Sequence, residues 1–193
     1  MTQLDSLAKE VGVHGRTLRR AAGRGLLKAS RQGSRTVVLP ASERSYVRAY
    51  WPLIGGLLEA LRKQPNIRLA VLFGSVARGE AGEESDLDLL VEFGRDDYRA
   101  HAEAAAALEQ AAGRRVQMVG LGDAARAPLL LADVLRDGRV LVDRDDRWPT
   151  LKGRERSILT TARRSDARRQ RLAWEAPNAL EEIGRRRVSV ANG

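Results

Sequence analysis

The sequence predicts an α/β domain with a small central sheet, preceded by a mostly helical module and followed by a helical segment. Apolar runs of strand length alternate with stretches of helical periodicity between residues 66 and 149. Apolar residues recur at helical spacing on either side, in residues 4–22, 42–64 and 153–175. With 193 residues, the chain is long enough to bury one large core or two small ones.

Charge is distributed unevenly along the chain, whose formal net charge is +9. Residues 1–40 contain eight Lys or Arg against two acids, and residues 153–193 contain ten Arg against five acids. Residues 66–149 contain eleven Arg against sixteen acids. An acidic middle suits a metal site, and basic ends suit nucleic acid or an acidic partner. For the C-terminal segment, a solvated Arg-rich helix face is the alternative.

The composition excludes several classes of protein. The chain has no cysteine, so disulfides and thiolate metal sites are ruled out. The first residues lack the basic and apolar regions of a signal peptide. No apolar run approaches the roughly 20 residues that a membrane-spanning helix needs. We therefore expect a cytoplasmic protein that does not contact a membrane.

Residues 4–22 have the pattern of two short helices around a tight turn. Gly12 lies at the break and permits the positive φ that such a turn requires, and Asp5 or Ser6 is expected to cap the first helix. This spacing resembles the helix-turn-helix family, with a second helix from about residue 14 to residue 22. The residues expected to face outward, toward phosphates or base edges, are His14, Arg16, Thr17, Arg19 and Arg20.

A β-hairpin is expected after the two helices. Apolar runs in residues 25–30 and 35–40 flank a polar turn that contains Gly33. A hairpin in this place resembles a wing, with Arg31 and Arg35 at its tip along a DNA backbone. We expect residues 1–40 to form a winged helix-turn-helix module that binds DNA. The alternative is a small module for protein contacts or dimerisation.

Residues 41–65 are expected to form connecting helices. Ser42 is the expected N-cap. Pro52 suits the first turn of a helix and not its interior, which predicts either two helices or one kinked helix. The aromatic residues of this segment, such as Tyr46 and Trp51, are expected in the core between the modules rather than on a base-stacking surface.

The domain at residues 66–149 is expected to contain four strands and three helices. The helix at residues 96–112 opens at Asp96 or Asp97 and is closed by Gly113. The C-terminal extension, residues 150–193, is expected to be a basic helical segment. The expected strands are 67–73, 86–93, 115–119 and 139–143, and the expected helices are 74–79, 96–112, 123–137, 153–175 and 178–185.

The stretch that carries chemistry is a Gly-Ser turn followed by two aspartates. Gly74 and Ser75 end an apolar run and offer backbone N–H groups and a hydroxyl, which suit phosphate. Asp86 and Asp88 are two residues apart on a strand, so their side chains point to the same face. Two adjacent carboxylates repel each other unless a cation lies between them, and hard oxygen ligands suit Mg²⁺.

Gly74 to Gly79, followed by Ser85 to Val91, resembles the minimal nucleotidyltransferase family of the polymerase-β-like superfamily, over roughly residues 66–148. The resemblance implies a nucleotidyltransferase core made of a small mixed sheet with flanking helices. It implies that Gly74 lets the backbone approach the triphosphate and that Ser75 binds its phosphates. It also implies that Asp86 and Asp88 hold Mg²⁺, two ions in the family's usual route.

The reaction that the resemblance implies is attack of an acceptor oxygen on the α-phosphorus of a nucleoside triphosphate, with ATP the expected donor and pyrophosphate released. Arg78 is expected either to steer phosphate or to pair with Glu83 or Glu84. Ser85 is expected to be a cap or turn residue rather than a ligand.

The sequence departs from the family pattern at one position. The family has a third carboxylate on the next strand, where this chain has Gln117. An amide accepts a hydrogen bond, but it carries no charge and cannot act as a general base. Substitutes elsewhere in the domain would be Asp123, Asp133 or Asp143, although nothing near them in the sequence favours them. The departure leaves turnover by the two-metal route an open question.

Two functions remain, from different classes. The first is an Mg²⁺-dependent enzyme that transfers a nucleoside monophosphate to a protein, RNA or small-molecule hydroxyl. Stand-alone domains of this family resemble antitoxins that partner HEPN-type ribonuclease toxins, and the N-terminal module would then bind promoter DNA. The second is a DNA-binding regulator with a degenerate nucleotidyltransferase domain. Antibiotic modification is a third option that gives the N-terminal module no role. The acceptor and the oligomeric state are left open.

Overall fold

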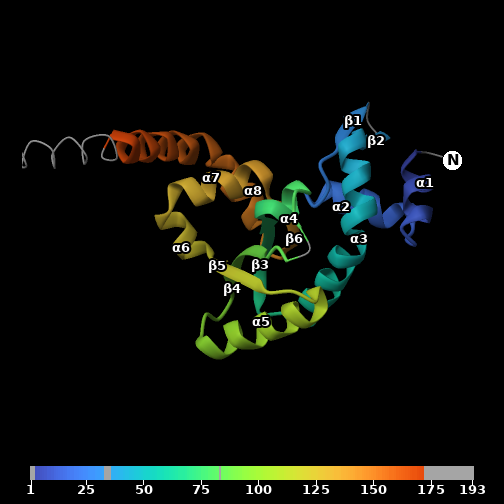
Figure 1. The fold of residues 1–193 in the computed structure, drawn as a ribbon, viewed down its shortest axis with the longest axis horizontal. Coiled ribbons are helices and arrows are strands. Elements are labelled where there is room, and N and C mark those ends of the chain that lie inside the picture. The colour runs from blue at the N-terminus through green and yellow to red at the C-terminus, as the bar shows by residue number, and fades with distance from the viewer. Residues whose placement is uncertain (1–2, 33–35, 83, 172–193) are drawn as a thin grey trace, which may run out of the picture.

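The computed structural model describes residues 3–32, 36–82 and 84–171, and its centre is a four-stranded mixed sheet with helices on both faces (Figure 1). The strand order is β5-β4-β3-β6, in which β3 is antiparallel to both neighbours and β4 is parallel to β5. All four predicted strands are confirmed to within one residue at each end. They are β3 (Ile67–Phe73), β4 (Leu87–Phe93), β5 (Val116–Gly120) and β6 (Arg139–Asp143).

The two central strands are buried on both faces, which is why they appear in the sequence as nearly continuous apolar runs. In β3 every residue except Arg68 is buried. In β4, Leu87 and Leu89 are fully buried, whereas Asp88 between them is half-buried. The predicted alternation at the start of β4 is therefore confirmed, and it leaves one polar face at this end of the sheet.

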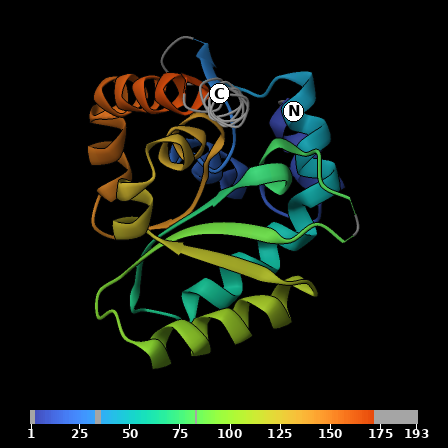
Figure 2. The ribbon, with the colours of Figure 1, turned by 60° about the vertical axis from the view of Figure 1, so that its left-hand side comes forward.

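Two layers of helix cover the sheet. On one face lie α3 (Ala41–Arg62) and α5 (Tyr98–Ala112), and on the other lie α6 (Leu121–Arg126) and α7 (Pro128–Asp137), as Figure 2 shows. Leucines from the first pair of helices pack on β3 and β4 through Leu72 and Leu89. The opposite core is smaller and forms around Val71 and Leu90.

The N-terminal module contains α1 (Gln3–Glu10), α2 (Gly15–Gly23) and an antiparallel hairpin of β1 (Ser30–Gln32) and β2 (Thr36–Val38). Gly12 has a φ of +72° in the turn between the helices, as expected. The expected cap of α1 is wrong, because Asp5 and Ser6 both lie inside the helix. Arg35 lies outside the described residues.

The connecting segment is a single helix, α3, that continues through Pro52. Two separate helices are therefore not found, and the expected N-cap Ser42 lies within the helix, with Pro40 at the cap position. Burial of one face explains the continuity, since Val47, Trp51 and the leucines after them pack in the core and outweigh the missing proline N–H. Tyr46 and Trp51 are core residues, as expected.

The helix predicted at residues 123–137 is two helices. They separate at Ala127, because Pro128 lacks an N–H and disfavours helical geometry in the residue before it. A short helix that was not predicted, α8 (Arg147–Gly153), follows β6. Residues 155–171 are helical, and the remainder of the predicted C-terminal helices lies outside the described residues.

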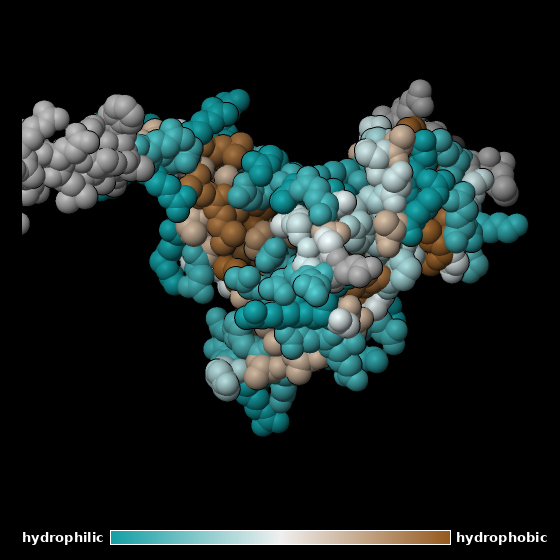
Figure 3. Space-filling view, viewed as in Figure 1, coloured by the Kyte–Doolittle hydropathy of each residue, from teal (hydrophilic) through white to brown (hydrophobic). Residues whose placement is uncertain are grey.

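The surface is mostly hydrophilic in the view of Figure 3, with a large apolar area over α6, α7 and the helix at residues 155–171 and a smaller one near α1. Leu121, Leu130 and Ile158 are half-buried there, packed at the edge of the smaller core. Among the described residues, no helix is both long and apolar enough to cross a membrane.

Candidate functional site

Gly74 joins the end of β3 to α4 (Gly74–Arg78) and touches the side chain of Asp88. Its φ is +73°, a conformation that residues with a side chain rarely adopt. A Cβ at this position would overlap the Asp88 carboxylate. Glycine is therefore needed here twice, for the turn and for the close approach of a carboxylate to the backbone.

Asp86 and Asp88 lie together at the start of β4. Asp88 is opposite Phe73 in the antiparallel register, so it stands next to the turn at Gly74. Burial raises the pKa of Asp88, the charge of Asp86 raises that pKa further, and Arg78 lowers it. The two carboxylates are thus close enough to repel, as expected from their spacing, and a bound cation would relieve this repulsion.

Ser75 and Arg78 are both on α4. Ser75 is half-buried in the first turn, and its hydroxyl has no hydrogen-bond partner among the residues that the structure describes. Arg78 donates from Nε to Glu80 at 2.7 Å and lies 4.0 Å from Asp137. Its partner is therefore Glu80 rather than Glu84; the other expected partner lies outside the described residues.

Ser85 has the role expected of it. Its hydroxyl accepts a hydrogen bond from the Gly82 N–H at 3.0 Å, and its own N–H donates to the Gly82 carbonyl. These two bonds make a turn that leads the chain into β4. Ser85 is therefore a turn residue that stabilises this loop.

Gln117 lies directly beside Asp88 in the parallel register of β4 and β5, and its side chain is exposed. The described residues contain no group of three His, Cys, Asp or Glu that could hold a metal ion. The proposed substitutes are engaged elsewhere: Asp123 pairs with Arg126, Asp133 pairs with Arg136, and Asp143 accepts from backbone N–H groups of α8.

The remaining donor set is two carboxylates and one amide oxygen. Oxygen donors of this kind are the ones that Mg²⁺ prefers, and a cation bound there would offset the charge of Asp86 that raises the pKa of Asp88. Asp86 and Asp88 would hold the ion, with the Gln117 amide alongside.

A buried ion pair supports the site from behind, and it was not predicted from the sequence. Arg139, at the start of β6, donates to both carboxylate oxygens of Glu43 and, at 2.6 Å, to the carbonyl of Ala77 in α4. Both side chains are about 96–97% buried, and the guanidinium lies 3.5 Å from the centre of the Tyr46 ring. The available signal was an arginine inside the apolar run of a strand.

The predicted DNA-binding residues of α2 are exposed, but they have different neighbours. Arg16 is exposed, and Arg19 donates to Asp5 at 2.6 Å. Thr17 and Arg20 line a hollow between α2, α3 and β6. His14 is at the N-cap position of α2, and Arg31 is in β1. All five residues predicted to face outward from this helix are therefore exposed, and DNA contact by them stays a prediction.

Comparison with known proteins identifies the central domain. Residues 56–147 match the family model "Polymerase beta, Nucleotidyltransferase". The matched segment is just under half of the chain and contains Gly74, Ser75, Asp86 and Asp88, so the resemblance of this motif to nucleotidyltransferases of the polymerase β family is confirmed.

A curated relative and two solved structures are similar to the chain. A protein of Methanocaldococcus jannaschii named "Putative protein adenylyltransferase MJ1379" is 44% identical over 43 residues, which are 22% of this chain and 43% of that protein. The chain thus matches less than half the length of this relative. A toxin–antitoxin structure with AMP-PNP is 24% identical, with a TM-score of 0.50 over 64% of this chain and 97% of the other. A mutant of the toxin–antitoxin pair MntA–HpeT is 22% identical, with the same TM-score and the same coverage. These two structures show a shared fold.

Proposed function

We propose that the chain is a nucleotidyltransferase that moves AMP from ATP to a hydroxyl group. The contact between Gly74 and Asp88 carries this proposal, because it brings a free hydroxyl, turn N–H groups and two repelling carboxylates to one place. The family match and the adenylyltransferase relative support the reaction class and the donor.

Each part of the site has a task in such a reaction. The Ser75 hydroxyl and the N–H groups of the turn bind the triphosphate, and the positive φ of Gly74 lets its backbone come close. Asp86 and Asp88 would hold Mg²⁺, which would neutralise charge on the attacking and leaving oxygens. The acceptor oxygen bonds to the α-phosphorus as the bond to pyrophosphate breaks. The chain's own contribution is mainly positioning.

We infer that the acceptor is a hydroxyl on a partner protein, a toxin of the HEPN type, and that this chain is its antitoxin. Two structures that share the fold are described as toxin–antitoxin assemblies, one of them with an ATP analogue. A protein acceptor also suits a site at the open polar end of a sheet, where a loop or tail can enter.

The test is transfer of label from ATP to the partner in the presence of Mg²⁺. Asp86→Asn with Asp88→Asn should reduce transfer by about a thousandfold or more, because the cation loses both charged ligands. Asp123→Asn with Asp145→Asn is the matched control, since these aspartates form ion pairs with Arg126 and Arg68 away from the site. Equal transfer by the wild type and the Asp86/Asp88 variant would show that the proposal is wrong.

We also propose that the N-terminal module binds DNA, with promoter DNA as the partner. The net positive charge of residues 1–40 and the exposed Arg16 on α2 support it. Arg16→Gln should weaken binding to a DNA fragment and lower its salt dependence by about one counterion. Binding that does not change with salt would count against a phosphate-contacting module.

One observation favours a second function. Gln117 stands where the family has a carboxylate, so the domain could serve as a nucleotide-binding part of a DNA-binding regulator. In that case ATP binds and DNA binds, but no acceptor receives label at any Mg²⁺ concentration. Transfer to the partner that depends on Asp88 would exclude this alternative.

A further inference from the structure

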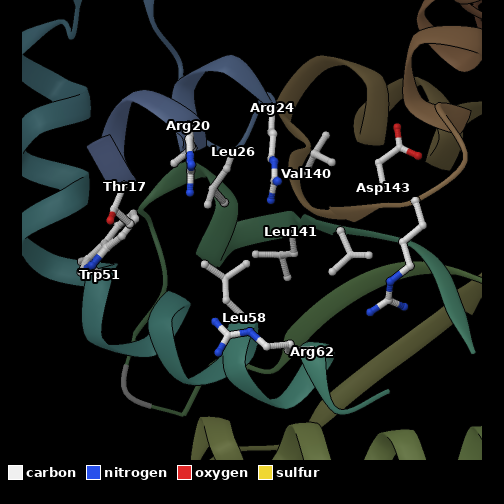
Figure 4. A pocket seen from close by; sticks show the side chains of 13 residues that line it. Thr17, Arg20, Arg24, Leu26, Trp51, Leu58, Arg62, Val140, Leu141 and Asp143 are labelled. Atoms are coloured by element: carbon white, nitrogen blue, oxygen red, sulfur yellow. The ribbon is translucent and has the colours of Figure 1, made fainter. Parts of the chain in front are cut away.

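The hollow that Thr17 and Arg20 line lies between the N-terminal module, α3 and the edge strand β6 (Figure 4). Its volume is about 560 Å³, within the range of small-molecule sites. The walls are α2, α3 and the stretch of β6 from Val140 onward. Gly74, Ser75, Asp86 and Asp88 do not line it, so it is separate from the candidate active site.

The floor of the hollow is apolar. Trp51 and Leu58 come from α3, Leu26 follows α2, and Val140 and Leu141 belong to β6. Trp51 is only 5% exposed, and Leu26 and Leu141 are 3% exposed. A flat apolar group of a ligand would therefore rest on side chains already fixed by the core, at little cost in conformational entropy.

The walls carry three arginines without partners among the described residues. Arg20 and Arg24 reach down from the α2 side, and Arg62 lies on the α3 wall opposite them (Figure 4). None of these three guanidinium groups makes a hydrogen bond or an ion pair with any residue that the structure describes. Three guanidinium groups around one hollow repel one another, and an anion between them would relieve that repulsion.

The other charged residues of the hollow are already engaged. Arg144 donates to main-chain carbonyls, among them those of Leu61 and Gln64. Asp143 accepts from the N–H groups of Arg147 and Trp148. Asp143 keeps its negative charge, but four arginines line the hollow against this one carboxylate, so the lining is positive in sum.

We propose that this hollow binds a nucleotide, with its phosphates between Arg20, Arg24 and Arg62 and its base on the floor at Trp51. Guanidinium groups bind phosphate oxygens in pairs, and an aromatic and aliphatic floor accepts the flat face of a base. An inorganic anion would leave the floor bare.

A nucleotide bound in the hollow would contact both the N-terminal module and the nucleotidyltransferase domain. The hollow touches α2 from the N-terminal module, α3 from the connecting segment and β6 from the nucleotidyltransferase domain. The ligand therefore joins the two domains. Thr17 and Arg20 then serve this site rather than DNA.

The experiment measures ATP binding to the full chain by equilibrium dialysis on a background that disables the active site, Ser75→Ala with Asp86→Asn and Asp88→Asn. This background should keep one ATP per chain. Adding Arg20→Gln and Arg62→Gln should weaken that binding at least about tenfold. Adding Arg16→Gln and Arg19→Gln, which removes the same charge from residues of α2 that do not line the hollow, should leave it unchanged.

Two results would overturn the proposal. One is a background protein that binds no ATP, and the other is an equal loss in both arginine pairs. Inorganic triphosphate and adenosine serve as competitors, because the first tests the phosphate contacts alone and the second tests the base contacts alone. ATP should bind at least about tenfold more tightly than either of them, whereas equal binding of ATP and triphosphate would contradict a role for the floor.

Discussion

Gln117 and Asp88 are neighbours across the parallel strands β4 and β5, and only Asp88 can carry charge. Asp88 is half-buried, and the nearby charge of Asp86 already raises its pKa. A neutral amide beside it avoids a third repelling charge but gives up a ligand for a second cation. In the proposed reaction, the activity of the site would therefore depend on how well this one pair of carboxylates holds Mg²⁺.

Gln117→Asp should increase the transfer rate by about tenfold or more, because it restores a third carboxylate beside Asp88. The rate at saturating ATP, followed over a range of Mg²⁺ concentrations, measures the effect. Gln110→Asp adds the same charge at an exposed position of α5 and should leave the rate unchanged. If the rate stays at the wild-type value in both variants, the amide of Gln117 does not limit the transfer rate.

Gly74→Ala should abolish transfer, since a Cβ would displace the Asp88 carboxylate and strain a φ of +73°. Gly113→Ala is the matched control, because Gly113 has a φ of +64° and an added methyl group there would meet no described atom within 4 Å. Both variants should lose about 1 kcal/mol of stability from the backbone, but only Gly74→Ala should lose activity. Activity in the Gly74 variant would contradict the contact with Asp88.

Asp88→Asn should raise the melting temperature at neutral pH. Because the pKa of Asp88 is raised in the folded state, the folded protein holds this proton more tightly than the unfolded chain does. Stability therefore falls as pH rises from the unfolded value of about 4 through the folded pKa. The gain in the variant should disappear below about pH 4, where Asp88 is protonated in both states.

Mg²⁺ gives this prediction its control. Adding the ion at neutral pH should stabilise the wild type by binding the folded state, and it should do so far less in Asp88→Asn. Thermal unfolding with and without Mg²⁺ compares the two proteins. A variant that is less stable than the wild type at neutral pH would show that Asp88 is not under electrostatic strain.

Glu43→Ala should destabilise the fold by roughly 3–5 kcal/mol, because it leaves the buried Arg139 guanidinium without its anion. Adding Arg139→Met should recover most of that loss. Glu10→Ala breaks an exposed pair with Arg48, whose side chains are about half exposed, and should cost less than about 1 kcal/mol. Urea unfolding measures all four proteins. A small loss in Glu43→Ala would mean that water reaches the pair.

The strands and the motif could be predicted because they depend on local patterns. Strands β3 and β4 are apolar enough to be identified by composition, and the spacing of Asp86 and Asp88 fixes their common face. Gly74 was identified by its place after a strand. Its contact with Asp88 depends on the antiparallel pairing of β3 and β4, which sets Phe73 opposite Asp88.

The features that were not predicted depend on packing between distant parts of the chain. Pro52 stays in a helix because tertiary burial on α3 outweighs its local preference. The pair of Glu43 and Arg139 joins residues 96 positions apart, and no local pattern relates them. Arg20 is exposed as predicted, but the hollow beside it could not be predicted, because it depends on where α2 lies against β6.

The most direct measurement of nucleotidyl transfer at this site uses ATP labelled in turn at the α- and γ-phosphorus. After incubation with Mg²⁺ and the partner toxin, label from the α-position should be found on the toxin, and label from the γ-position should be found only in pyrophosphate. The toxin should gain the mass of AMP, and Asp86→Asn with Asp88→Asn should prevent the gain. Transfer of the γ-label to the toxin, or of neither label, would contradict this reaction.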